Sequence, residues 1–243
     1  MLSVENTWKE VRDSGVDTVI VPFSAIEQHG HHLPLGTDWF LADENARRLG
    51  ERLNAYVLPA LAYGCSREHM AFAGTVTLRP TTLAAIFEDV VESLREHGFK
   101  NIVVFSSHGG NWILKPILRE INFQYPDIIV VWGNGPLADD GEEVPEDIHA
   151  GRGETAAMLA VRPDLVKNHE SAPASSGIVG QEFNDYVGMD KSTKTGAWGV
   201  PAEGTAELGE ERIAGNVDHQ IRYIEWALRR VEMLRSEGGA TDR

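Results

Sequence analysis

Cysteine is nearly absent from this chain, because Cys65 is the single one among 243 residues. One cysteine excludes an internal disulfide framework and a cysteine-rich zinc finger. Basic residues are also scarce, with 22 Lys and Arg against 37 Asp and Glu and a formal net charge of -15. Phosphate backbones and anionic membrane surfaces bind clustered basic residues. We therefore expect no nucleic-acid partner and no membrane partner.

Long hydrophobic runs are missing as well. No segment reaches the roughly 18 consecutive apolar residues that a transmembrane helix needs. The N-terminus lacks the basic stretch and apolar run of a signal peptide. The hydrophobic fraction of 42% is typical of a globular chain and excludes wholesale disorder. We therefore expect a soluble, cytoplasmic protein.

Short β-branched runs alternate with amphipathic segments along the chain. This alternation predicts a mostly parallel sheet with helices on both faces. No linker or repeat divides the chain, so we expect a single three-layer α/β/α domain over residues 1–243, with a frayed tail at 236–243. Strands are predicted at 17–23, 55–59, 100–105 and 128–132, helices at 39–53, 81–97, 112–123, 151–161 and 205–235, and mostly irregular structure at 167–201.

Carboxylates and imidazoles gather in three segments. One segment, E-Q-H-G-H-H-L-P-L-G-T-D at 27–38, follows the first predicted strand, and S-H-G-G-N at 107–111 follows the third. The last, H-A-G-R-G-E-T at 149–155, leads into a predicted helix. Ligands of such sheets bind beyond the carboxyl ends of the strands. The candidate metal ligands in these segments are Glu27, His29, Asp38, His108 and Glu154.

A set of two Glu, one Asp and two His, without Cys, suits Zn²⁺, Mn²⁺ or Fe²⁺. Five protein ligands exceed the roughly three of a catalytic zinc site. They fit two ions that share a bridging carboxylate. The sequence therefore predicts two divalent metal ions per chain.

Each of these side chains also has a structural alternative. Glu27 and His29 could simply line a polar loop, and Asp38 could be the N-cap of the helix that follows it. His108 could be a core histidine bonded to the backbone, and Glu154 could stabilise a helix N-terminus through the macrodipole. Spacing alone does not decide between these roles.

The three segments resemble the creatininase (creatinine amidohydrolase) family. So do E-H-M-A-F-A-G-T at 68–75 and G-A-W-G-V-P at 196–201, followed by T-A-E at 205–207. The similarity runs from about Val19 to about Gly209. It implies a creatininase-like fold, a two-metal centre, hydrolysis of carbon–nitrogen bonds in small or cyclic amides, and a homo-oligomer, often a hexamer.

Carried over by position, the resemblance implies that Glu27 and His108 bind one metal and His29 the other. Asp38 would bridge both ions. The resemblance also implies that His149 is the catalytic proton shuttle, because it matches the family's catalytic histidine. A positioning or helix-capping role is the alternative for His149.

One position departs from creatininase itself, which has a further glutamate where this chain has Gly110. We expect Glu154 to supply the missing carboxylate. The departure puts creatinine in doubt as the substrate and favours the broader His-Gly-Gly-Asn branch of the family. That branch includes formamidopyrimidine-type deformylases, peptide-processing hydrolases and enzymes that open cyclic polyol ketones.

Five further side chains receive weaker expectations. His69, Glu146 and Trp198 are candidate substrate contacts, although His69 could be structural, Glu146 could be a solvated acidic residue and Trp198 could pack at an interface. His32 is expected to orient a metal ligand through a hydrogen bond, and Asn111 to fix the loop that holds the metal-binding histidine.

The sequence thus predicts a hydrolase that cleaves a carbon–nitrogen bond in a small-molecule amide with metal-activated water. One alternative keeps the metal centre but hydrolyses a cyclic polyol ketone at a carbon–carbon bond, or processes a peptide. The other alternative is a non-catalytic binding module. Serine-hydrolase chemistry is disfavoured, because Ser106 and Ser107 lack the Gly-x-Ser-x-Gly pattern.

Overall fold

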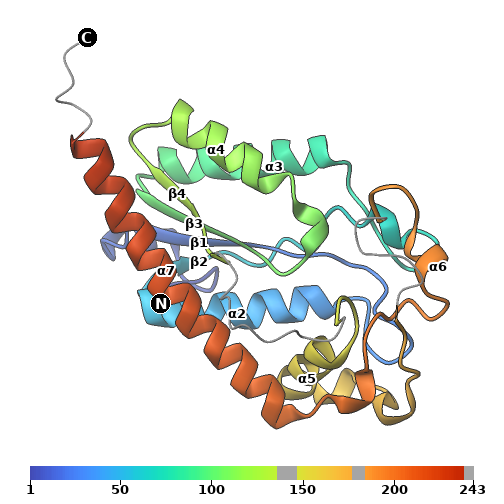
Figure 1. Cartoon of the computed structure of the whole chain (residues 1–243). Coiled ribbons are helices and arrows are strands. Elements are labelled where there is room, and N and C mark those ends of the chain that lie inside the picture. Colours follow the sequence, from blue (N-terminus) through green and yellow to red (C-terminus); the bar gives the residue numbers. More distant parts are fainter. Residues whose placement is uncertain (136–146, 177–183, 238–243) are drawn as a thin grey trace.

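The computed structural model describes residues 1–135, 147–176 and 184–237. Its strands form one parallel sheet in the order β2-β1-β3-β4. In Figure 1, α3 and α4 cover one face of this sheet, and α2 and α7 cover the other. The predicted α/β/α architecture is confirmed. The strands are β1 (Thr18–Phe23), β2 (Tyr56–Val57), β3 (Asn101–Ser106) and β4 (Ile129–Trp132).

Helices connect the strands and extend the chain beyond them. Short 3₁₀ turns at Arg67–His69 and Gly109–Asn111 lie in the loops that lead to the candidate site. No helix of the described ranges is both long and apolar enough to cross a membrane. The helices are α1 (Trp8–Asp13), α2 (Thr37–Leu53), α3 (Pro80–Glu96), α4 (Leu114–Gln124), α5 (Arg152–Val161), α6 (Met189–Ser192) and α7 (Ala206–Glu237).

Strand β1 shows why the sheet lies at the centre of the molecule. Its alternate residues Val19, Val21 and Phe23 are buried with side chains of α3 and α4. Ile20 points to the other face and is buried with side chains of α2 and α7. A strand that is covered on both faces needs a continuous apolar run, which is what the β-branched residues of β1 provide.

Several boundaries differ from the sequence prediction. The predicted strand 55–59 is shortened to Tyr56–Val57, although the N–H groups of Leu58 and Leu61 still donate to the Ile20 and Pro22 carbonyls of β1. Helix α4 starts at Leu114 because the 3₁₀ turn precedes it. Helix α1 was not predicted, although Thr7 and Glu10 form a capping box at its start. Helix α7 continues to Glu237, so the tail predicted to fray from 236 begins as ordered helix.

The sheet brings the candidate segments together at one edge. Phe23 at the end of β1 is in register with Ser106 at the end of β3, and the two strands are parallel. The loops that follow them therefore leave the sheet side by side. Ser107 reinforces this arrangement, since its backbone N–H donates to the Phe23 carbonyl at 3.1 Å and its hydroxyl donates to the Asp38 carbonyl at 2.9 Å.

Candidate metal centre

Five side chains converge beyond the carboxyl ends of β1 and β3. Glu27 and His29 come from the loop after β1, and His108 comes from the loop after β3. Asp38 and Glu154 lie in the first turns of α2 and α5. The first four are buried, whereas the Glu154 side chain is 30% exposed. The structure therefore brings all five predicted metal ligands into one cluster.

The donor atoms lie at distances that allow metal binding. His108 faces Glu27 at 3.3 Å and Asp38 at 3.5 Å, and His29 faces Asp38 at 3.6 Å and Glu154 at 3.7 Å. Asp38 thus lies between the two histidines, as a bridging ligand would. The groups whose ligand atoms all lie within 4.8 Å are Glu27–Asp38–His108, His29–Asp38–Glu154 and Glu27–His29–His149.

Unpartnered buried atoms indicate that a cation belongs here. Both carboxylate oxygens of Glu27, Nε2 of His29 and Oδ2 of Asp38 are buried without a hydrogen bond to any described residue. Burying such polar atoms without a partner is costly, and for a charged group the cost is larger. Divalent ions bound by these atoms would remove that cost. The donor set of nitrogen and carboxylate oxygen also suits zinc, manganese or iron.

Backbone carbonyls fix the orientation of three imidazoles. Nδ1 of His29 donates to the Glu27 carbonyl at 3.1 Å, and Nε2 of His108 donates to the Cys65 carbonyl at 2.8 Å. Nε2 of His149 donates to the Gln28 carbonyl at 2.7 Å. The other nitrogen of each ring faces a carboxylate, which is Asp38 for His29 and His108 and Glu27 for His149. Such bonds are the usual way in which a protein sets the tautomer of a metal-binding histidine.

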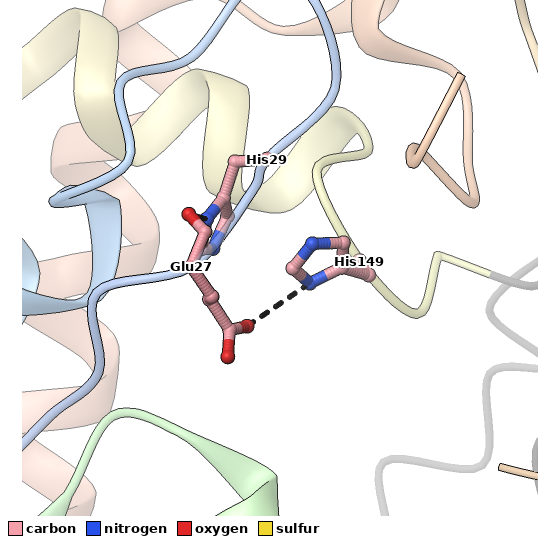
Figure 2. Close-up of side chains that lie close together, drawn as sticks. All are labelled: Glu27, His29 and His149. Atoms are coloured by element: carbon pink, nitrogen blue, oxygen red, sulfur yellow. Dashed lines mark hydrogen bonds and ion pairs between the residues drawn. The ribbon is translucent and has the colours of Figure 1, made fainter. Parts of the chain in front are cut away.

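Figure 2 shows how His149 faces the loop of Glu27 and His29. Its Nδ1 atom lies 3.7 Å from Oε1 of Glu27, and its ring centroid lies 4.3 Å from that of His29. Burial lowers the pKa of His149, and the neighbouring His29 lowers it further. A neutral imidazole with a free Nδ1 can accept a proton in the centre or bind a metal ion there.

His69 is protonated at Nε2, as His149 is, but it directs this N–H toward Glu27, whereas His149 directs Nδ1 there. Its Nδ1 accepts a hydrogen bond from Nε2 of Gln28 at 2.7 Å. The orientation of that amide is set by Gly30, whose N–H donates to Oε1, and by Gly196, whose carbonyl accepts from Nε2. Nε2 of His69 therefore carries the proton and points toward Glu27 at 3.4 Å. Burial lowers the pKa of His69 to about 3, so the ring is a neutral hydrogen-bond donor.

The carboxylates reverse the effect of burial on two histidines. Burial lowers the pKa of His29, but Glu154 and Asp38 outweigh it and raise the value to about 10. Burial likewise lowers the pKa of His108, and Glu27 and Asp38 outweigh it and raise the value to about 10. Without metal, both rings are protonated, and their positive charge balances the negative charge of the carboxylates.

The pKa values of Asp38 and Glu27 shift in opposite directions. Burial raises the pKa of Asp38. Burial also tends to raise the pKa of Glu27, but the imidazoles of His108, His69 and His149 outweigh it and hold the value below its usual range. Glu27 is therefore an anion in the folded protein, ready to bind a cation.

Of the structural alternatives for Asp38 and Glu154, the first is wrong and the second is compatible with metal binding. Asp38 does not cap α2, because the N-cap is Gly36, which has no side-chain bond to the helix, and Asp38 lies inside the first turn. Glu154 does stabilise the start of α5, where Oε2 accepts from the Ala150 N–H at 2.5 Å. That same oxygen faces His29, so one carboxylate serves both positions.

The side chains of Asn111 and His32 support the segments that hold the proposed ligands His108 and Glu154. The Asn111 side chain accepts from the Cys65 N–H at 2.9 Å and donates to the Ser24 carbonyl at 3.1 Å. It thereby ties the loops after β1 and β3 to the segment that orients His108. His32 contacts no ligand of the described cluster by hydrogen bond, and its Nε2 instead lies 3.0 Å from the Thr155 hydroxyl. The neighbouring residue in α5 is Glu154, so His32 supports the helix turn that holds this carboxylate.

A cavity of about 290 Å³ opens onto the centre. His69 lines it, as expected of a substrate contact. Trp198 does not, since its side chain is 1% exposed and its backbone pairs with His149 in an antiparallel bridge. Glu146 lies outside the described residues. Sequence reasoning missed Gln28, whose position between Glu27 and His29 was the available signal.

The sequence matches a known protein family. A family model described as "Creatininase: Creatinine amidohydrolase" matches residues 4–224. The chain is 34% identical over 187 residues to the creatinine amidohydrolase of Pseudomonas putida, covering 67% of this chain and 72% of that protein. It is 28% identical over 230 residues to the mycofactocin precursor peptide peptidase of Mycobacterium tuberculosis, covering 85% and 84%. It is 24% identical over 173 residues to the 3-dehydro-scyllo-inosose hydrolase of Thermotoga maritima, covering 66% and 56%.

Solved structures share the fold. A creatinine amidohydrolase (creatininase) structure matches with a TM-score of 0.76 and 25% identity, covering 99% of both chains. A creatininase variant of Zn-Zn type matches with a TM-score of 0.74 and 25% identity over 97% of both chains. A creatininase with Mn matches with a TM-score of 0.75 and 25% identity over 97% and 98%. With a family model that spans most of its length, this chain belongs to the creatininase family of hydrolases.

Proposed function

We propose that this chain is a dinuclear metal-dependent amidohydrolase that cleaves a carbon–nitrogen bond in a small or cyclic amide. Glu27 and His108 would hold one divalent ion, His29 and Glu154 the other, and Asp38 both. The observation that carries the proposal is the position of Asp38, which belongs to both ligand groups. The Zn-Zn and Mn forms of related creatininases support the choice of metals.

Bound ions would lower the pKa of a water molecule and polarise the substrate carbonyl. Asp38 and Glu27 hold their oxygens toward the place where the ions would bind. His149 would accept a proton at Nδ1, because its Nε2 is already committed to the Gln28 carbonyl. It would then return that proton to the leaving nitrogen, which departs as an amine.

His69 would add a second polar contact. Its tautomer leaves an N–H at Nε2 that points toward the centre from the cavity wall. A donor in that position can bind a substrate carbonyl or stabilise the negative charge that develops on its oxygen. The neutral state of the ring at physiological pH leaves it a donor that does not compete with the metals.

The names of two relatives suggest two alternative reactions for the proposed metal centre. One relative is a peptide peptidase and another is an inosose hydrolase. For this chain, peptide processing is the stronger of the two alternatives, because the peptidase match covers 84% of that protein against 56% for the inosose hydrolase. A non-catalytic binding module is disfavoured, since such a module has no need for orphaned buried carboxylates.

Metal content of the gently purified protein, measured per chain by elemental mass spectrometry, tests the centre. We expect about two ions of zinc, manganese or iron. One ion or none after reconstitution would contradict the dinuclear centre. Turnover of creatinine, simple formamides, short peptides and cyclic polyol ketones by the loaded protein then tests the reaction class, and cleavage of the ketones alone would contradict amide hydrolysis.

Assembly is a separate part of the proposal. The family resemblance favours a homo-oligomer, with a hexamer as the commonest form. Light scattering coupled to size-exclusion chromatography measures this directly. A monomer at micromolar concentration would contradict it.

A further inference from the structure

Gly110 has no room for a side chain. A Cβ atom placed there would lie 2.2 Å from the Cys65 carbonyl oxygen and 2.3 Å from Nε2 of His108. The next nearest atom is Oε1 of Glu68, at 3.0 Å. The Glu68 carboxylate therefore lies immediately beside Gly110.

Glu68 approaches from a different part of the chain. It lies in the 3₁₀ turn Arg67–His69 and forms part of the cavity wall, with a side chain that is 20% exposed. Oε1 lies 3.9 Å from Nε2 of His108 and 3.9 Å from Nε2 of His69. Both distances are too long for hydrogen bonds.

Glu68 is also separate from the metal-binding groups. None of the three groups of described residues whose donor atoms lie close enough to share an ion includes it. Its carboxylate is thus placed beside the centre, at the cavity wall, where a substrate would lie. The unpartnered oxygens of Glu27, where a metal ion would bind, line the same cavity.

The charge of the cavity wall limits which substrate groups can bind beside Glu68. Beyond the proposed ligands, the described lining contains the carboxylates of Glu68 and Asp185, and Arg67 is its one Arg or Lys. Two divalent ions would supply four positive charges, which Glu27, Asp38, Glu154 and a hydroxide would together neutralise. The Glu68 wall would then remain negative, which disfavours anions there.

We propose that Glu68 is a substrate-contacting residue that accepts hydrogen bonds from nitrogen donors next to the scissile bond, so that it selects such donors over anionic groups. This proposal rests on the proposed function, because it concerns the substrate contacts of the same centre.

The test uses methylguanidine as the cationic donor probe and acetate as the anionic one. Binding of each to the metal-loaded protein is measured by titration calorimetry for wild type, Glu68→Gln and Glu68→Asp. Glu88→Gln removes the same charge from the exposed surface of α3 and is the matched control. Metal content and circular dichroism of every variant are recorded alongside.

We expect Glu68→Gln to weaken methylguanidine binding about tenfold or more, since a charge-assisted hydrogen bond is lost. Glu68→Asp should retain part of the affinity, and Glu88→Gln all of it. Metal content should stay at the wild-type value, and acetate should bind no more weakly to Glu68→Gln than to wild type. Unchanged methylguanidine binding in Glu68→Gln, or none to wild type, would overturn the proposal.

Loss of metal from folded Glu68→Gln would also overturn it, because Glu68 would then be a metal ligand. If Glu68→Gln does not fold, the Glu68→Asp and wild-type titrations decide, and equal affinity in both together with equal binding of acetate overturns the proposal. Failure of the proposed function can be told apart from failure of the Glu68 proposal. It would appear in the metal content and turnover of the wild-type protein, which are measured without methylguanidine.

Discussion

Nε2 of His149 donates a hydrogen bond to the backbone carbonyl of Gln28 at 2.7 Å. This bond joins the segment before α5 to the loop after β1, 121 residues away in sequence. It also fixes the tautomer, so that Nδ1 faces the Glu27 carboxylate at 3.7 Å. His149 is therefore held in the orientation that a proton shuttle or a metal ligand needs, and the two roles have different consequences.

Replacing His149 with Ala separates these roles. If His149 is the shuttle, kcat should fall by about 10²- to 10⁴-fold while the protein keeps its metal. Turnover and metal content are measured on the same preparation. His31→Ala is the control, because it removes an exposed histidine from the neighbouring loop. Loss of an ion from the His149 variant would instead identify His149 as a ligand.

Asp38→Ala should remove metal more completely than any other single ligand change. Asp38 belongs to both ligand groups, so its loss weakens both sites at once. We expect less than one ion per chain by elemental mass spectrometry and no detectable turnover. Asp43→Ala, on the exposed part of the same helix, should bind metal like the wild type. An active Asp38 variant with two ions would show that the carboxylate does not bridge.

Gly110→Ala and Gly109→Ala form a matched pair in one 3₁₀ turn. A Cβ at position 110 would overlap the Cys65 carbonyl and the His108 ring, whereas a Cβ at position 109 meets nothing within 4 Å. We expect Gly110→Ala to cost about 1–3 kcal/mol and to lower metal affinity, because His108 must move. Gly109→Ala should change neither. Equal melting temperatures for the two variants would contradict this prediction.

The pH dependence of stability should differ between the metal-free and the metal-loaded protein. The pKa values of His29 and His108 are raised from 6.5 to about 10 without metal. A raised folded-state pKa adds stability that is fully present below pH 6.5 and is lost as the pH rises through 10. The melting temperature of the chelator-treated protein should therefore fall between pH 7 and pH 10.

Metal binding should abolish that dependence, because bound imidazoles carry no proton at the binding nitrogen. At pH 7.5, loading should release up to two protons, which calorimetry in buffers of different ionisation enthalpy can count. His69 and His149, whose pKa values are lowered, are neutral throughout this range and do not contribute. A metal-free melting temperature that stays flat from pH 7 to pH 10 would contradict the assignment.

Sequence periodicity was sufficient for the architecture, because buried parallel strands such as β1 need uninterrupted apolar runs and covering helices need an apolar stripe. Periodicity predicted the extent of the short strand β2 less well. β2 forms only two residues of strand, since pairing at a sheet edge depends on the neighbouring backbone as well as on composition. The capping box of Thr7 and Glu10 is a local sequence signature that indicates the start of α1.

By itself, the sequence determined the fold class and named the candidate ligands, because candidate ligands follow from residue type and loops after parallel strands share one edge of the sheet. Tertiary structure decided what each residue does there. It placed Asp38 inside the first turn of α2 and buried Trp198 outside the cavity. It also directed the N–H of His69 but the Nδ1 atom of His149 toward Glu27. It also placed Glu68 beside Gly110. These outcomes depend on contacts between segments distant in sequence, which no local pattern records.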